Sequence, residues 1–392
     1  MNKFVFTLTN IDVDNCSIEE LDNEILRLES IKDDYHNREM SIKIFINSIY
    51  GAVGSPWFEC YNVALAEATT LQGQDMIKYT NTILDDYFMN IWHLDKALHN
   101  AMGLTYVNKI SVKSVVIYND TDSTYITLEH VLQSCDWQGT PVDFVLKLKQ
   151  LRLGNYVKQK FDEYAKKYNT INIQDLELEK ISHSALMVAK KKYILDLAWK
   201  EPGVYFAPQE KIKPVGVEIV QGSTPPFSRK ALKTMINLMF AQQKSLKYAD
   251  MVQKLKELKK DFILQDPDQI SKTQSIGDYE KYVLEDRTEI RLAPKCPMNV
   301  RSAAVYNNTL LNSKLKSKYN LIKTGDKLKF YYAKTNENVF GFLPGNYPYE
   351  IAPQMDYDKQ FSTVMVEPFN RFMEAAGFNS IPGNLVYAAA LF

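Results

Sequence analysis

Two aspartates separated by one residue are the clearest chemical signal in this chain of 392 residues. Asp120 and Asp122 lie in the polar segment 119–123, between runs rich in β-forming residues at 115–118 and 124–128. Two such runs around a short polar centre predict a hairpin between packed strands. Because side chains alternate between faces along an extended chain, we expect both carboxylates on one side of the hairpin.

The chemistry of this pair depends on what lies between the two negative charges. Neighbouring carboxylates repel unless a proton or a cation separates them, and hard oxygen ligands on a rigid turn suit Mg²⁺ or Mn²⁺. The alternative is an ordinary solvated turn, since aspartate and asparagine are common in turns. The Asp-x-Asp spacing alone leaves both interpretations open.

A second group of polar residues follows helical spacing. Lys43, Asn47, Tyr50 and Gly51 stand at i, i+4, i+7 and i+8, which places them on one face of a helix. The lysine can supply charge to a phosphate and the asparagine a hydrogen bond, while Tyr-Gly forms a flat platform that a base pair can approach. The alternative is a partly buried helix end, with Gly51 and Gly54 as caps.

Three consecutive lysines form a third signal. Lys190, Lys191 and Lys192 precede Tyr193 and are enclosed by apolar, strand-like sequence at 186–188 and 194–195. A run of lysines is usually a solvated turn. Inside a sheet, however, at least one of these side chains must leave it, and an anionic partner is the favoured destination.

Together, the three segments resemble motifs of the family B DNA polymerases, in the order that the family uses. The matching stretches are Lys43-x3-Asn47-Ser48-x-Tyr50-Gly51, Tyr118-x-Asp120-Thr121-Asp122-Ser123 and Lys190-Lys191-x-Tyr193. The resemblance implies that Asp122 is a catalytic metal ligand and Asp120 its supporting carboxylate. It implies that Lys43 and Asn47 hold the phosphates of an incoming dNTP, and that Tyr50 and Gly51 face the nascent base pair. Lys190, Lys191 and Tyr193 would contact the backbone of primer–template DNA.

Two later segments extend the resemblance. The stretch Pro294-Lys295-Cys296-Pro297, with Arg301 beyond it, resembles the thumb of T-even phage polymerases and implies DNA contacts by Lys295 and Arg301. A packed turn with surface charges is the alternative, because a phosphate contact requires only a basic residue in the right place. Members of this phage family end in a hydrophobic peptide that binds a sliding clamp. The final Leu391 and Phe392 share little more than an aromatic with it, so clamp binding is a hypothesis.

One part of the expected chemistry is absent from this sequence. Phosphoryl transfer by two metals needs carboxylates from two strands, and only one such strand is evident. The family's other metal-binding aspartate lies in an Asp-x-x-Ser-Leu-Tyr-Pro segment, which this sequence lacks, as it lacks the exonuclease carboxylates. The resemblance therefore predicts the C-terminal subunit or fragment of a split DNA-directed DNA polymerase, inactive alone. Two Mg²⁺ ions, with Mn²⁺ as a substitute, would be shared with a carboxylate of an N-terminal partner subunit that also carries the exonuclease.

The elements that must position these residues form an α+β pattern. Ser17 and Glu20 match a capping box, which predicts a long helix from there to residue 48 or beyond. The expected architecture is a polymerase palm with an antiparallel sheet and packed helices, a helical fingers segment and a mixed, mainly helical thumb. The predicted domains are fingers at 1–55, palm at 56–220 and thumb with tail at 221–392. Further expected elements are helices at 57–88, 142–168, 228–244, 248–262 and 356–376, strands at 104–110 and 328–333, and several strands within 175–222. Asp85 and Asp86, near the end of the helix at 57–88, are expected to be solvated surface.

Composition sets broader limits. The 47 basic and 47 acidic residues balance, so a DNA channel must come from local clustering of charge. The four cysteines show no Cys-x-x-Cys spacing, which argues against a zinc site or a disulfide framework. The chain shows no apolar run of about 18 residues and no secretion signal, so we expect no membrane association and a place in the cytoplasm of an infected bacterium.

A rival interpretation is a non-catalytic DNA-binding or scaffold subunit derived from a polymerase. Such a protein would keep its lysine contacts but have no use for the aspartate pair. The presence of Asp120, Asp122, Lys43 and Asn47 favours an enzyme. A second rival is an RNA-templated or RNA-making polymerase. Selection between ribose and deoxyribose cannot be read here, because the resemblance puts the residue responsible in the absent upstream segment.

Overall fold

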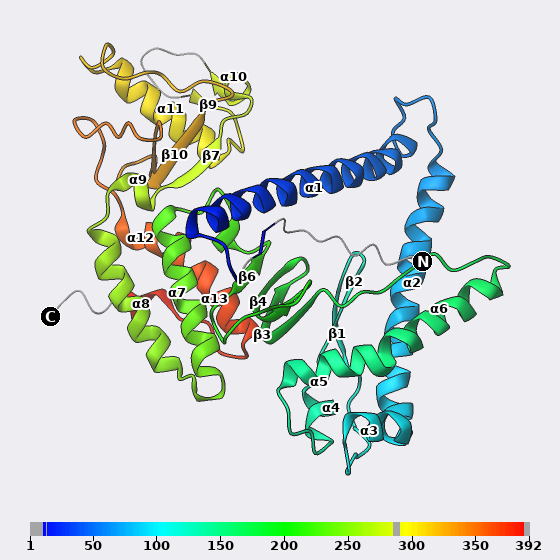
Figure 1. The fold of residues 1–392 in the computed structure, drawn as a ribbon. Coiled ribbons are helices and arrows are strands. Elements are labelled where there is room, and N and C mark those ends of the chain that lie inside the picture. The colour runs from blue at the N-terminus through cyan, green and yellow to red at the C-terminus, as the bar shows by residue number, and fades with distance from the viewer. Residues whose placement is uncertain (1–10, 13, 285–290, 388–392) are drawn as a thin grey trace. The chain divides into compact units, whose positions relative to one another are not determined.

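The protein folds as two compact units in the computed structural model, which describes residues 11, 12, 14–284 and 291–387 (Figure 1). The smaller unit combines the described part of Met1–Tyr87 with Ser114–Ile126. The larger unit combines Phe88–Lys113 with the described part of Thr127–Phe392. Every pairing between described strands is antiparallel, and helices pack around these sheets, so the predicted α+β fold is confirmed.

The smaller unit consists of two long helices and one hairpin. Helix α1 (Ile18–Val53) starts with the predicted capping box: the backbone N–H of Glu20 donates to Ser17 Oγ, and the backbone N–H of Ser17 donates to Glu20 Oε2. It continues without a break to the cap at Gly54. Helix α2 (Val63–Asp86) starts at the cap Asn62, later than the predicted residue 57. Strands β1 (Val116–Asp120) and β2 (Ser123–Ile126) contact α2.

The first part of the larger unit is helical. Residues 142–168 were expected to form a helix, and α5, η3 and α6 follow one another there without a gap. Residues 104–110 do not form the predicted strand. Val107 makes a single antiparallel bridge with Cys135, and the pairing stops there because the backbone N–H groups of Thr105 and Tyr106 donate to the carboxylate of Asp136. The elements are η1 (Tyr87–Ile91), η2 (Trp92–Leu94), α3 (Lys96–Met102), α4 (Glu129–Gln133), α5 (Pro141–Leu148), η3 (Lys149–Leu153) and α6 (Gly154–Lys167).

An antiparallel sheet follows, as predicted for 175–222. Strands β3 (Lys180–Ala189) and β4 (Lys192–Lys200) form its long hairpin, and β4 also pairs with β5 (Val204–Tyr205) and β6 (Ile212–Val215). The short helix η4 (Glu218–Val220) comes directly after β6. Most of β4 is buried, which explains its nearly continuous apolar sequence.

The remaining part is mainly helical, as predicted, with a second small sheet in the order β11-β10-β7. The expected helices at 228–244, 248–262 and 356–376 and the strand at 328–333 are all present within a few residues. The elements are α7 (Pro226–Gln242), η5 (Gln243–Ser245), α8 (Tyr248–Ile263), α9 (Pro267–Ile270), β7 (Lys272–Ser275), α10 (Tyr279–Tyr282), β8 (Val283–Leu284), β9 (Arg291–Leu292), α11 (Met298–Leu311), β10 (Lys327–Tyr332), β11 (Val339–Phe342), α12 (Tyr357–Phe361), η6 (Ser362–Val366), α13 (Glu367–Ala375) and α14 (Gly383–Tyr387).

The main hydrophobic core of the larger unit joins the β3–β4 hairpin to the helices that follow it, while Val142 of α5 packs with Ala198 and Trp199 of β4 in a separate cluster. The main core extends from Leu186 and Ile194 of the β3–β4 hairpin, through α7 and α8, to Phe369 and Phe372 of α13. The core thus continues across residue 221, and the division into fingers, palm and thumb stays a prediction. Among the described helices, none is both long enough and apolar enough to cross a membrane.

Candidate functional site

The aspartate pair lies at the tip of the β1–β2 hairpin. The two strands pair from Val116 opposite Ile126 to Asp120 opposite Ser123, with a shift of register between Val116 and Tyr118, and Thr121 and Asp122 form the turn. The predicted hairpin is confirmed. The premise of strict alternation is wrong at Thr121, whose φ of 60° is left-handed, and the N–H of Asp122 donates to the Asp120 carbonyl at 2.8 Å. A tight turn, and not an extended strand, therefore sets the positions of the two carboxylates.

An aspartate of α2 fixes the base of this hairpin, a role that the sequence gave no signal for. We had expected Asp85 to be solvated surface. Its carboxylate accepts hydrogen bonds from the backbone N–H of Val115 at 2.8 Å and from Ser114 Oγ at 2.8 Å. These bonds join the start of β1 to the end of α2, over 29 residues of sequence.

A pair of asparagines fixes the hairpin nearer its tip. Asn81 of α2 and Asn119 of β1 bond reciprocally, with N–O distances of 2.8 and 3.1 Å, and Asn119 also donates to Thr124 Oγ1. The Asn119 side chain lies between α2 and β2, and both amides are satisfied.

The hairpin can contribute part of a divalent metal site. The donors are hard carboxylate oxygens, which fit Mg²⁺ or Mn²⁺, and Asp122 at the tip is exposed to solvent while Asp120 is half-buried. Across the described residues, however, no group of three or more His, Cys, Asp or Glu side chains is placed to hold a metal ion. The two aspartates therefore fit an ion that takes its further ligands from elsewhere.

The polar stripe lies on α1, as predicted, and all four residues are exposed. Lys43 Nζ lies 2.5 Å from Glu39 Oε1, a surface pair whose side chains are more than half exposed. Such pairs contribute only about 0–1 kcal/mol, so the lysine can exchange this partner for a phosphate at little cost. The hydroxyl of Tyr50 lies 2.8 Å from Thr70 Oγ1 of α2, which orients the phenol ring.

Gly51 lies in the last turn of α1, which ends at Val53, and Gly54 is the residue that caps the helix. The alternative that both glycines are caps is therefore confirmed for Gly54 and wrong for Gly51. A Cβ atom at residue 51 would meet no described atom within 4 Å, so packing within the described structure does not require glycine here.

The lysine run forms the tip of the β3–β4 hairpin. Ala189 pairs with Lys192, which leaves Lys190 and Lys191 as the exposed turn. The side chain of Tyr193, in β4, is buried and only 7 % exposed. The structure thus brings Lys190 and Lys191 to the surface together, while Tyr193 contributes its ring mainly to packing.

A cluster of three lysines on the same sheet was not predicted. Lys180 of β3 pairs in register with Lys200 of β4, and both lie near Lys213 of β6. Burial and these two neighbouring ammonium groups lower the pKa of Lys213. The sequence offered no signal, because the three residues come from different strands and meet only in the folded sheet.

The remaining predicted contacts lie apart from these motifs in the sequence. Lys295 is exposed in a turn with φ of 60°, just before α11. Arg301 on α11 is half-buried, and its Nε is enclosed without a hydrogen-bond partner among the described residues. Leu391 and Phe392 lie outside the described residues, so clamp binding stays a prediction.

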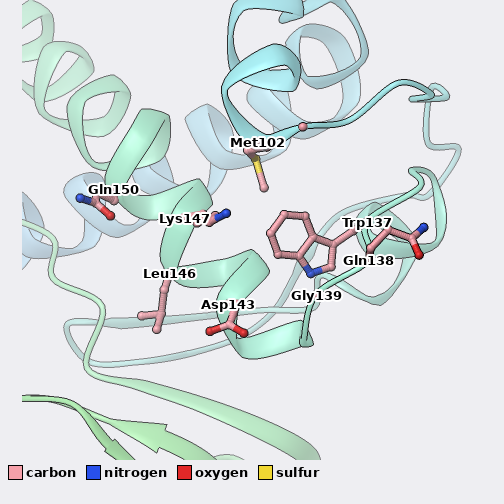
Figure 2. Close-up of a pocket in the computed structure, with 9 residues that line it drawn as sticks. Met102, Trp137, Gln138, Gly139, Asp143, Leu146, Lys147 and Gln150 are labelled. Atoms are coloured by element: carbon pink, nitrogen blue, oxygen red, sulfur yellow. The ribbon is translucent and has the colours of Figure 1, made fainter.

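A pocket of about 500 Å³ lies between the end of α3, α5 and the loop before α5 (Figure 2). Its walls include Met102, Trp137 and Lys147, with Lys147 Nζ 5.1 Å from the centre of the Trp137 ring. The indole is held in place because its Nε1–H donates to the Thr140 carbonyl. None of the predicted site residues lines this pocket.

Comparison with known proteins shows the family to which the chain belongs. The model of DNA polymerase family B matches residues 27–368, so the chain belongs to this family. It is 24% identical to the DNA-directed DNA polymerase of Escherichia phage RB69 over 69% of this chain, and 22% identical to that of Enterobacteria phage T4 over 88%. A DNA polymerase catalytic subunit of elephantid herpesvirus 1 is 21% identical over 84%. The matched regions make up 29%, 38% and 30% of these three relatives.

Proposed function

We propose that this chain carries the nucleotide-adding part of a DNA-directed DNA polymerase, and that a second polypeptide completes its active site. The observation that carries the proposal is the hairpin tip, where Asp120 and Asp122 stand on a turn that α2 holds in place. Membership of DNA polymerase family B supports the same reaction. The proposed substrates are primer–template DNA and dNTPs.

Each group of residues has a separate task in this proposal. Asp122, supported by Asp120, would hold divalent ions, which supply Lewis acidity toward the α-phosphate when bound. Lys43 and Asn47 would bind the triphosphate, and Tyr50 with Gly51 would support the new base pair. Lys190 and Lys191 would bind backbone phosphates, with Lys295 and Arg301 as further DNA contacts.

The small number of carboxylates at the hairpin supports the need for a second polypeptide. Two-metal catalysis requires carboxylates from two strands, and this sequence lacks the second family motif. Among the described residues, no group of three or more His, Cys, Asp or Glu side chains is placed to hold a metal ion without further ligands. The partner would supply the missing aspartate.

The surface of α1 gives independent support for a partner. Ile42, Phe45, Ile46 and Ile49 form an apolar stripe at helical spacing, each between 51% and 66% exposed. This stripe lies on a different face of α1 from the stripe of Lys43, Asn47 and Tyr50. One face of the helix is thus polar and available for a nucleotide, whereas the other has the composition of a packing interface.

Reconstitution tests the proposal. Extension of a labelled primer on a template is measured with dNTPs and Mg²⁺, first with this chain alone and then with a polypeptide that carries Asp-x-x-Ser-Leu-Tyr-Pro. We expect weak DNA binding without extension from the chain alone, and extension from the mixture. Asp122→Ala should lower extension by the mixture at least about a thousandfold, because it removes a metal ligand.

The control is Asp75→Ala, which removes an exposed carboxylate of α2 whose nearest cation, Lys78, is 3.8 Å away. It should leave extension unchanged. Robust extension by the chain alone would show that no partner is needed. Full extension by the Asp122→Ala mixture would instead favour the scaffold interpretation.

A further inference from the structure

A buried carboxylate lies beneath the lysine turn of the β3–β4 hairpin. Glu218 of η4 is 8 % exposed, and its Oε1 accepts a hydrogen bond from Arg371 of α13 at 2.6 Å. Lys192 Nζ, from the residue that follows the turn, lies 3.8 Å from the same oxygen. Of the three consecutive lysines, Lys192 is half-buried and forms a loose ion pair with Glu218, whereas Lys190 and Lys191 are exposed.

The backbone of the same segment also supports the turn. Gly216 has a left-handed φ of 65°, and a Cβ atom there would lie 2.1 Å from the carbonyl oxygen of Lys191. The carbonyl of Gly216 accepts a hydrogen bond from Gln221 Nε2 at 2.9 Å. Residues 216–221 thus contact the backbone of Lys191 and the side chain of Lys192.

We propose that Glu218 and Arg371 are positioning residues for DNA binding by Lys190 and Lys191. The inference rests on the proposed function, because it assumes that this turn binds backbone phosphates. Arg371 fixes Glu218, Glu218 fixes Lys192, and the start of β4 is thereby fixed relative to α13, which packs against β3. A turn held in one place loses less conformational entropy on binding than a mobile one.

The substitution Glu218→Gln separates positioning from simple electrostatics by the sign of its effect. Loss of a negative charge near a DNA-binding turn should tighten binding if charge alone matters. If Glu218 positions the turn, binding should instead weaken about three- to tenfold, and the slope of log affinity against log salt should fall by about one. Fluorescence anisotropy of a labelled primer–template with the full chain measures both quantities.

Three comparisons make the test specific. Glu177→Gln removes an equal charge from an exposed residue ahead of β3 and should not weaken binding. Arg371→Lys keeps the positive charge beside Glu218 and should bind more tightly than Arg371→Ala. In a Lys190→Ala/Lys191→Ala chain, Glu218→Gln should have no further effect, because the contacts that it positions are gone.

The outcomes distinguish this inference from the proposed function. If Lys190→Ala/Lys191→Ala leaves DNA binding unchanged, the turn does not bind DNA and both proposals for it are wrong. If that double variant weakens binding but Glu218→Gln matches or exceeds the wild type, positioning is wrong while the DNA contact stands. An equal loss from Glu218→Gln with and without the two lysines would also overturn positioning.

Discussion

At the scale of single residues, the β1–β2 hairpin depends on side chains that have no part in the proposed chemistry. Asp85 accepts bonds from Ser114 and Val115, and Asn81 bonds reciprocally with Asn119. A two-stranded hairpin is only marginally stable in water without such support. The position of Asp122 is therefore set by α2 as much as by its own turn.

Asp85→Ala tests this dependence. It leaves the N–H of Val115 without its acceptor and leaves the Ser114 hydroxyl only the Val116 carbonyl at 3.1 Å, so we expect a loss of about 1–3 kcal/mol in the free energy of unfolding. Urea unfolding measures that loss, and hydrogen exchange should show faster opening of β1. Asp75→Ala is the matched control on the same helix and should stay within about 0.5 kcal/mol of wild type. Equal stability of the two variants would contradict the anchoring role.

At the scale of elements, the lysine turn depends on the strand beside it. The tip of the β3–β4 hairpin packs against Gly216, whose φ is left-handed. The carbonyl oxygen of Lys191 lies where a Cβ atom of residue 216 would be. Glycine is the residue that permits both conditions. The hairpin sequence by itself contains no sign of this requirement.

Gly216→Ala should therefore destabilise the larger unit by about 1–3 kcal/mol, through the clash and the strained φ together. Gly222→Ala is the control, because a Cβ atom there would meet no described atom within 4 Å. Thermal unfolding compares the two variants. A Gly216→Ala protein as stable as Gly222→Ala would show that the turn moves aside without cost.

At the scale of the whole molecule, α1 is a 36-residue helix with little of its surface covered. Among the described residues of α1, only Glu24 is buried. Most helical stability in proteins comes from packing of an apolar face, so a helix of this kind is expected to have a partner surface. The stripe of Ile42, Phe45, Ile46 and Ile49 is the surface that the proposed second polypeptide would cover.

Phe45→Glu should weaken association with that polypeptide at least about tenfold, since it places a charge in an apolar contact. Lys32→Glu changes the charge of an exposed residue on the same helix and should have a much smaller effect. Isothermal titration calorimetry with the two purified chains measures both affinities. Unchanged affinity of Phe45→Glu would exclude this stripe from the interface.

The sequence by itself determined the local elements and the motifs. Hydrophobic period, the Ser17–Glu20 capping box and the polar centre at 119–123 led to α1, the paired helices α7 and α8 and the β1–β2 hairpin, because such signals depend on neighbours within a few residues. The order of the motifs identified the family, which the match over residues 27–368 confirms.

Only the tertiary structure decided how these motifs are held. Asp85 was expected in solvent but anchors β1, Thr105 and Tyr106 donate to Asp136 where a strand was expected, and Glu218 bonds to Arg371 across 153 residues of sequence. Each of these contacts joins residues far apart in the chain. The residue type fixes which hydrogen-bonding groups a side chain carries. The packing of the whole fold decides which partner those groups meet, and no local sequence pattern specifies that partner.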